Sequence, residues 1–156
     1  MLQRFNKALD QVSASLLAGL LVVMVLAVTW QIISRYLLGD PSGWTEELAR
    51  FLLIWIGLFG GTFAYQRRLH LGLDLLAERL DGNPGRWHAR FVDFCILIFA
   101  LAILVVGGAA LVALTHELEQ FSPALGLPMA VVYLSLPLSG ISMAIAALAA
   151  LAGKGQ

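Results

Sequence analysis

Three ionisable side chains with helical spacing have the types needed to bind a metal ion. His70, Asp74 and Glu78 recur at every fourth residue, which would place an imidazole and two carboxylates on one face of a helix. A solvated polar face explains the same spacing more simply. His116 and Glu117 resemble the start of a zinc protease motif, but the second histidine of that motif is missing from the sequence. We therefore predict that this chain is not an enzyme and that it holds no metal or cofactor.

The segment 35–50 carries the densest group of side chains suited to binding another protein. Glu46 and Glu47 precede Arg50 by four and three residues, so either carboxylate could pair with the guanidinium on one helix. Trp44 suits the headgroup region of a membrane. A capped helix end with an aromatic anchor would use the same residue types as a docking surface, so both interpretations stay open. The candidate interface residues in this segment are Arg35, Trp44, Glu46, Glu47 and Arg50.

Membrane-spanning helices are needed to position these residues. Ten Lys and Arg and ten Asp and Glu residues occur in the 156-residue chain, and all of them lie outside the apolar stretches 12–33, 51–65, 94–114 and 120–153. A hydrophobic content of 60% with 13% charged residues excludes an ordinary soluble core and a disordered chain. We predict an all-α integral membrane protein, a single domain over 1–156, with spans at about 12–33, 48–65, 91–114 and 129–151.

The hydrophilic segment between the second and third spans has a helical pattern of its own. Leu69, Leu73, Leu76 and Leu80 form one stripe, which predicts an amphipathic helix over about 69–80 at the membrane interface. With four spans, this segment and both termini lie on the same side of the membrane. Eight of the ten basic residues are on that side: Arg4, Lys7, Arg67, Arg68, Arg79, Arg86, Arg90 and Lys154. The positive-inside rule therefore predicts that both termini are cytoplasmic.

Small residues within the spans predict close helix packing. Gly57 and Gly61 form a GxxxG pair, and Gly140, Ala144 and Ala147 share a face of the fourth span. Such residues let backbones approach in lipid, where helices gain no hydrophobic drive from one another. The pattern alone leaves open whether these faces pack within the chain or against a partner.

Two other classes of membrane protein are disfavoured by where the ionisable residues fall. A self-sufficient small four-helix exporter would need a carboxylate well inside its first span, and 12–33 has none. A haem-binding or enzymatic bundle would need inward histidines, but His70, His88 and His116 lie outside the spans. For Asp93, which lies near Arg90 at the start of the third span, an interfacial ion pair with Arg90 is favoured over a proton relay. The net charge of zero argues against a nucleic-acid partner.

An ordered set of motifs resembles the small membrane subunit of tripartite ATP-independent periplasmic (TRAP) transporters. The resemblance covers nearly the whole chain, and no single short match in it would be specific. The motifs are Arg35-Tyr36, the run Trp44-Thr45-Glu46-Glu47-Leu48-Ala49-Arg50-Phe51, Trp55, Gly60, the pair His70 and Asp74 after two arginines, and Pro128, Tyr133, Leu136 and Pro137 near the end.

The resemblance implies a bacterial inner-membrane protein and a division of labour. It implies that a large membrane permease subunit carries the substrate and sodium sites, and that a periplasmic solute-binding protein delivers an organic acid. The small subunit would then be a scaffold for the large one, in contact with membrane lipids. His70 and Asp74 join the candidate partner interface on this basis, and Gly57 and Gly61 join it through their small-residue spacing.

Overall fold

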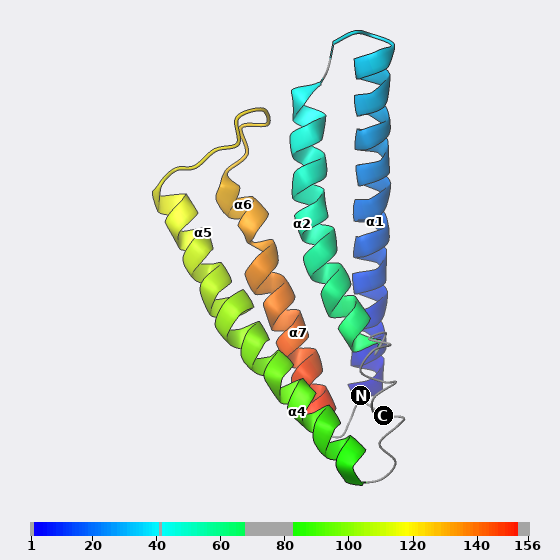
Figure 1. Ribbon diagram of the computed structural model, residues 1–156, viewed down its shortest axis with the longest axis vertical. Coiled ribbons are helices and arrows are strands. Elements are labelled where there is room, and N and C mark those ends of the chain that lie inside the picture. Colours follow the sequence, from blue (N-terminus) through cyan, green and yellow to red (C-terminus); the bar gives the residue numbers. More distant parts are fainter. Residues whose placement is uncertain (1, 41, 68–82, 153–156) are drawn as a thin grey trace.

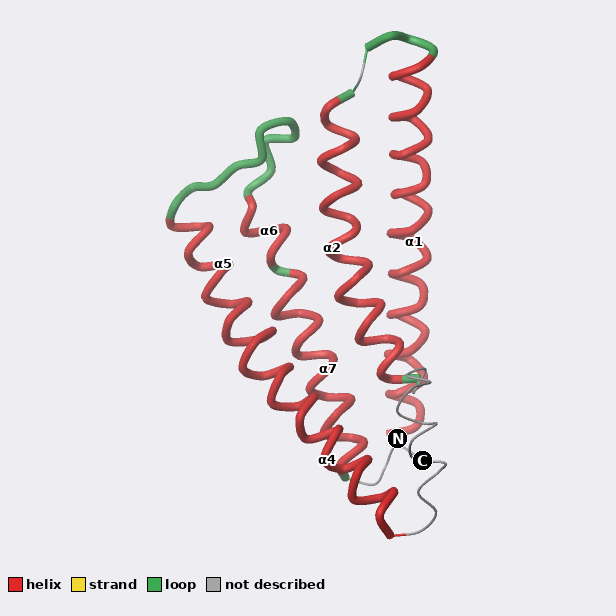
Figure 2. Tube along the Cα trace, in the orientation of Figure 1, coloured by secondary structure: helices red, strands yellow, loops and turns green. Residues whose placement is uncertain are grey.

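The computed structural model describes residues 2–40, 42–67 and 83–152, which form helices joined by loops (Figures 1 and 2). Within these ranges the β-structure is a single isolated bridge between Phe121 and Pro128. The predicted interfacial helix over 69–80 lies outside the described residues. The helices are α1 (Leu2–Tyr36), α2 (Gly43–Gln66), α4 (Asn83–Phe99), the π-helix η1 (Ala100–Gly107), α5 (Gly108–Glu117), α6 (Met129–Tyr133) and α7 (Ser135–Leu151).

Within the described ranges four helices are long and apolar enough to cross a membrane, which confirms the predicted fold class. Their candidate spans are Val12–Tyr36, Gly43–Gln66, Arg90–Glu117 and Met129–Leu151. The second helix begins at Gly43, so the candidate residues Trp44, Glu46 and Glu47 lie in its first two turns. The third span is one continuous rod built from α4, η1 and α5, and the fourth is built from α6 and α7.

The helices form an open layer instead of a closed bundle. Among the described elements α1 packs against α2 alone, α2 packs against α7, and α7 packs against α4 and η1. Figure 1 shows α1 and α2 side by side, with α5 leaning away from them toward the end that carries the loops 37–42 and 118–128. We call the end with these two loops the loop end. The opposite end, where α1 begins and α7 ends, is called the terminal end. Only 6% of the apolar window of α1 is buried.

The tightest helix contact joins α7 to η1 and α5 through two glycines. A Cβ added at Gly140 would lie 2.6 Å from the Cβ of Leu104 and 3.1 Å from the carbonyl oxygen of Ala100. A Cβ at Gly108 would lie 2.7 Å from the Cβ of Leu136. Because real Cβ atoms do not approach so closely, only glycine fits at these two crossing points. Gly140 shares its buried face with Ala144 and Ala147, so this predicted small face packs within the chain.

Hydrogen bonds join α2 to the second half of the chain near the terminal end. The Tyr65 hydroxyl donates to Oδ1 of Asp93 over 2.7 Å, and Gln66 Nε2 donates to Oγ of Ser142 over 3.4 Å. Asp93 therefore has Tyr65 of another helix as its partner. Among the described residues the one ion pair joins Arg50 to Glu46, so the predicted pair of Asp93 and Arg90 is wrong. In an apolar layer, such bonds satisfy polar groups that lipid cannot.

Candidate partner-binding site

One face of α2 is open from residue 46 to residue 61, and it brings together four of the predicted interface residues. Positions separated by four, three, four and four residues fall on one side of a helix. Five residues of α2 follow this spacing, and all five are exposed. We call it the open face of α2, and it consists of Glu46, Arg50, Leu53, Gly57 and Gly61.

An ion pair occupies the loop end of this face. Arg50 Nη2 donates to Glu46 Oε1 over 3.0 Å, as the i,i+4 spacing predicted. The two side chains are 67% and 64% exposed, so water screens the attraction between them. The pair therefore adds little to the stability of α2 and leaves both charges accessible to a partner.

Replacing Arg50 with Gln is expected to leave the stability of the chain almost unchanged. An exposed ion pair contributes about 0–1 kcal/mol, so the midpoint of unfolding in detergent should move little. Removing the charge should instead weaken binding of any partner that docks on the open face of α2. Thermal unfolding of the purified complex, together with the yield of co-purified partner, checks both expectations. A large drop in the unfolding midpoint would assign Arg50 to the fold.

The glycines of the open face have empty space above them. A Cβ added at Gly57 or at Gly61 would meet no atom within 4 Å, whereas one at Gly60 would lie 3.9 Å from Cδ2 of Leu17 in α1. The GxxxG pair therefore takes no part in packing between the described helices. Since small residues allow close backbone approach in lipid, the pair presents a shallow surface suited to another helix.

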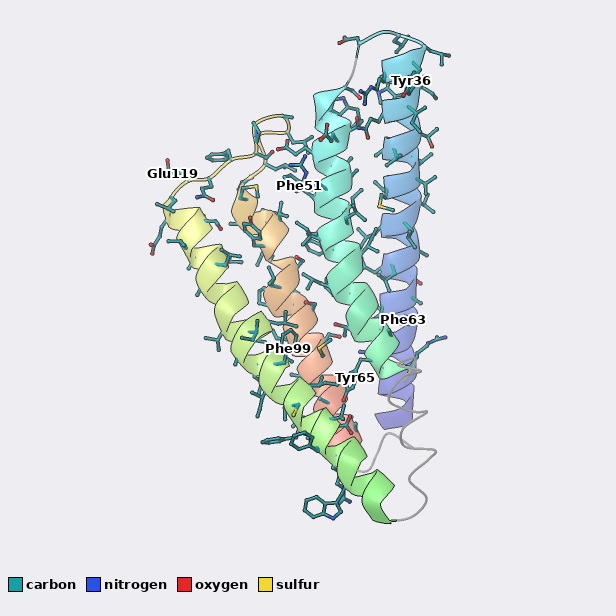
Figure 3. All side chains as sticks on the ribbon, viewed as in Figure 1. Tyr36, Phe51, Phe63, Tyr65, Phe99 and Glu119 are labelled. Atoms are coloured by element: carbon teal, nitrogen blue, oxygen red, sulfur yellow. The ribbon has the colours of Figure 1, made fainter. Side chains whose placement is uncertain are left out.

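Glu47 has a different role from the one its spacing suggested. Its Oε2 accepts hydrogen bonds from the backbone N–H groups of Ala124 and Leu125, over 3.0 and 2.8 Å. Of the two carboxylates that could pair with Arg50, only Glu46 does so among the described residues. The Glu47 carboxylate instead fastens the loop 118–128 to the first turns of α2. Figure 3 shows side chains of this loop and of α2 meeting at the loop end.

The loop 118–128 is itself held in one shape by backbone hydrogen bonds. Ser122 N–H donates to the Leu127 carbonyl over 2.9 Å, and Met129 N–H donates to the Gln120 carbonyl over 2.8 Å. The turn is completed by Gly126, whose φ of +64° is one that glycine adopts readily. Phe121 remains 60% exposed. The result is an ordered hairpin that carries an apolar side chain on its surface.

A chain of hydroxyl groups joins the end of α1 to the start of α2. Ser34 Oγ lies 3.1 Å from Ser42 Oγ, which lies 2.7 Å from Thr45 Oγ1. Thr45 is completely buried and also donates to the Ser42 carbonyl over 2.7 Å. Buried hydroxyls must find such partners, and here the partners fix the turn between the two helices. Sequence spacing indicated only a helix start in this segment.

The remaining predicted interface residues do not join the open face of α2. Arg35 is exposed in the last turn of α1, and among the described residues its side chain makes no ion pair. Trp44 is 44% exposed and lies two positions before Glu46, on another side of α2. His70 and Asp74 lie outside the described residues. Within the described part of the chain no cluster of metal-ligating side chains occurs.

The fold and the open face of α2 define an all-α, multi-pass membrane protein whose spans are free of charge away from their ends. Residues 24–154 match the family model described as tripartite ATP-independent periplasmic transporters, DctQ component. Because the match covers most of the chain, the protein belongs to this family and is a component of a transport system.

Curated relatives carry the same description in their names. The sialic acid TRAP transporter small permease protein SiaQ of Vibrio cholerae is 30% identical over 106 residues, 68% of this chain and 61% of the relative. The C4-dicarboxylate TRAP transporter small permease protein DctQ of Rhodobacter capsulatus is 31% identical over 105 residues, 64% of this chain and 44% of the relative.

A third relative is much longer than this chain. The isethionate TRAP transporter permease protein DctMQ of Oleidesulfovibrio alaskensis is 34% identical over 145 residues, which are 89% of this chain and only 22% of the relative. The chain therefore spans about three fifths of the Vibrio cholerae relative and about a fifth of this one.

Proposed function

We propose that this chain is the small membrane subunit of a TRAP transporter and holds the large permease subunit in place during sodium-coupled uptake of an organic acid. The observation that carries the proposal is the family match over residues 24–154, joined to an unoccupied open face of α2. On this proposal the chain supplies shape and contact area, and the large subunit moves the solute.

The absence of charge from the middle of the spans supports a passive role. A transporter that binds its own cargo or coupling ion places ionisable groups or broken helices near mid-membrane, since a charge there is costly unless it has a function. The sequence has no ionisable Asp, Glu, Lys or Arg in 12–33, 51–65, 94–114 or 129–151. We therefore assign the substrate and sodium sites to the large subunit.

The names of the relatives support an organic acid as the cargo. Sialic acid, isethionate and C4-dicarboxylate are each named for one of the relatives, and all three are organic acids. A periplasmic binding protein would deliver the acid. The distribution of basic residues supports an orientation in the bacterial inner membrane with both termini cytoplasmic and the loop end facing the periplasm.

Deleting the gene of this chain is the direct test. Uptake of the organic acid that thermally stabilises the cognate binding protein should be lost, and should return when the chain is supplied on a plasmid. The large subunit should co-purify with an affinity-tagged chain, and replacing the sodium gradient with a potassium gradient should abolish uptake. Full uptake by the large subunit alone, or accumulation of the acid by vesicles that contain only this chain, would contradict the proposal.

A further inference from the structure

A cavity opens beside the terminal end of α2, between three helices. It has a volume of about 340 Å³ and is lined by Tyr65 of α2, by Cys95, Ile96 and Phe99 of α4 and by Met143 of α7. Figure 3 labels Tyr65 and Phe99 on the two helices that flank it. The lining is almost wholly apolar, so the cavity offers water few hydrogen-bond partners. The apolar walls therefore favour an apolar occupant over water.

The cavity continues the open face of α2. Gly57, Gly61 and Tyr65 follow one another at four-residue spacing, so they form one row along the helix. The space above Gly57 and Gly61 is empty to 4 Å, and Tyr65 forms the wall of the cavity. The open face of α2 and the cavity therefore adjoin, and we call the two together the groove; it extends from the ion pair of Glu46 and Arg50 at the loop end to the cavity near the terminal end.

Other described helices of this chain leave the groove uncovered. α1 packs on another side of α2, and among the described residues it makes no contact with α4, η1 or α5. The long relative of Oleidesulfovibrio alaskensis points to a partner that could cover it, because there the matched segment is 22% of a single permease polypeptide. In that relative the segment similar to this chain and a much longer remainder of the permease belong to one polypeptide, so they occur at a ratio of one to one.

We propose that a transmembrane helix of the large permease subunit lies in this groove, with its backbone against Gly57 and Gly61 and an apolar side chain in the cavity beside Phe99. The inference rests on the proposed function, since it requires a large subunit. It adds the location and the chemistry of the contact. Gly57 and Gly61 form a row of small residues, which we call the seam, and the row ends at the apolar cavity. The exposed ion pair fixes the loop end of the contact.

Photocrosslinking in the complete transporter tests the location. Phe99→p-benzoylphenylalanine places a reactive ketone at the cavity while it keeps the aromatic ring. Illumination of membranes should give an adduct with the large subunit. The matched control is the same replacement at Ile141, which is 48% exposed but lies two residues before Met143 and so on the opposite side of α7.

The crosslinking result separates this inference from the proposed function. An adduct only with lipid, or only with a second copy of this chain, would overturn the inference even if the large subunit co-purifies. Adducts with the large subunit from Ile141 and none from Phe99 would overturn it as well. Failure of the large subunit to co-purify in any preparation would instead contradict the proposed function, and the inference would fall with it.

A pair of glycine substitutions tests the seam without disturbing the chain. Gly61→Leu and Gly19→Leu each place a side chain in open space on an exposed helical position, one in the groove and one on α1. Leu is the better helix former, so both variants should fold. We expect Gly61→Leu to lower the amount of co-purified large subunit by at least about tenfold, a factor worth about 1.4 kcal/mol. Equal co-purification of the large subunit with the two variants would show that it does not pack against the seam.

Discussion

Replacing Gly108 with Ala is expected to destabilise the chain, whereas the same change at Gly107 should be tolerated. A Cβ at position 108 would lie 2.7 Å from the Leu136 Cβ, 3.0 Å from the Pro137 Cδ and 3.1 Å from its backbone nitrogen. A Cβ at position 107 would meet only the carbonyl oxygen of Ala102, at 3.7 Å, which is an ordinary contact. The two glycines are neighbours, so each variant serves as the control for the other.

The size of the difference follows from two opposing terms. Alanine is the better helix former by about 1 kcal/mol, and both variants gain this term. Only Gly108→Ala must also push α5 and α7 apart, and overpacking of this kind costs about 1–3 kcal/mol. The difference between the two unfolding free energies therefore isolates the cost of crowding. Equilibrium unfolding of the reconstituted complex in sodium dodecyl sulfate measures it.

The same unfolding experiment with Gly140→Ala tests the close contact between α7 and η1. Its added Cβ would lie 2.6 Å from the Leu104 Cβ, so Gly140→Ala should also destabilise the chain. Equal stabilities for the Gly107 and Gly108 variants would mean that α7 does not approach α5 as closely as the structure has it.

The spans could be predicted from the sequence because the bilayer imposes two strict conditions. Charges are excluded from the hydrocarbon, and backbone polar groups must be satisfied within the segment, so long charge-free stretches such as 12–33 can only be helices. The π-helical segment Ala100–Gly107 could not be predicted in the same way. It contains no proline or polar residue that would mark it in the sequence, and it lies where Ala100 and Leu104 meet Gly140 of α7.

Within the candidate site, local contacts were predictable and distant ones were not. The pair of Glu46 and Arg50 follows from helical spacing alone. Glu47 and Asp93 each had a plausible partner on their own helix, yet they bond to groups far away in the sequence. Spacing rules describe contacts within one helix, so they cannot predict a contact with a segment that the fold brings close. For the same reason the pattern around Gly57 could not reveal which side of α2 stays open.

Replacing Glu47 with Ala is expected to release the loop 118–128 from α2. The change leaves the N–H groups of Ala124 and Leu125 without their carboxylate acceptor. Hydrogen bonds to a charged group contribute about 1.5–3 kcal/mol each, although the exposed Ala124 N–H can bond to water instead. A net loss of about 1.5–3 kcal/mol would speed amide exchange of these two groups by roughly tenfold to a hundredfold. Hydrogen–deuterium exchange with peptide mass spectrometry measures the rates.

Glu46→Ala is the matched control, because it removes the neighbouring carboxylate and leaves the loop contact intact. Its partner Arg50 is exposed, so the loss should be at most about 1 kcal/mol, and exchange in 118–128 should not change. Glu47→Gln keeps a neutral acceptor oxygen and should fall between the two. Because the hairpin also has backbone hydrogen bonds of its own, we expect it to keep its turn and lose only its position on α2. Unchanged exchange in Glu47→Ala would show that the carboxylate does not hold the hairpin, and that its own hydrogen bonds and the packing of α5 against α6 position it.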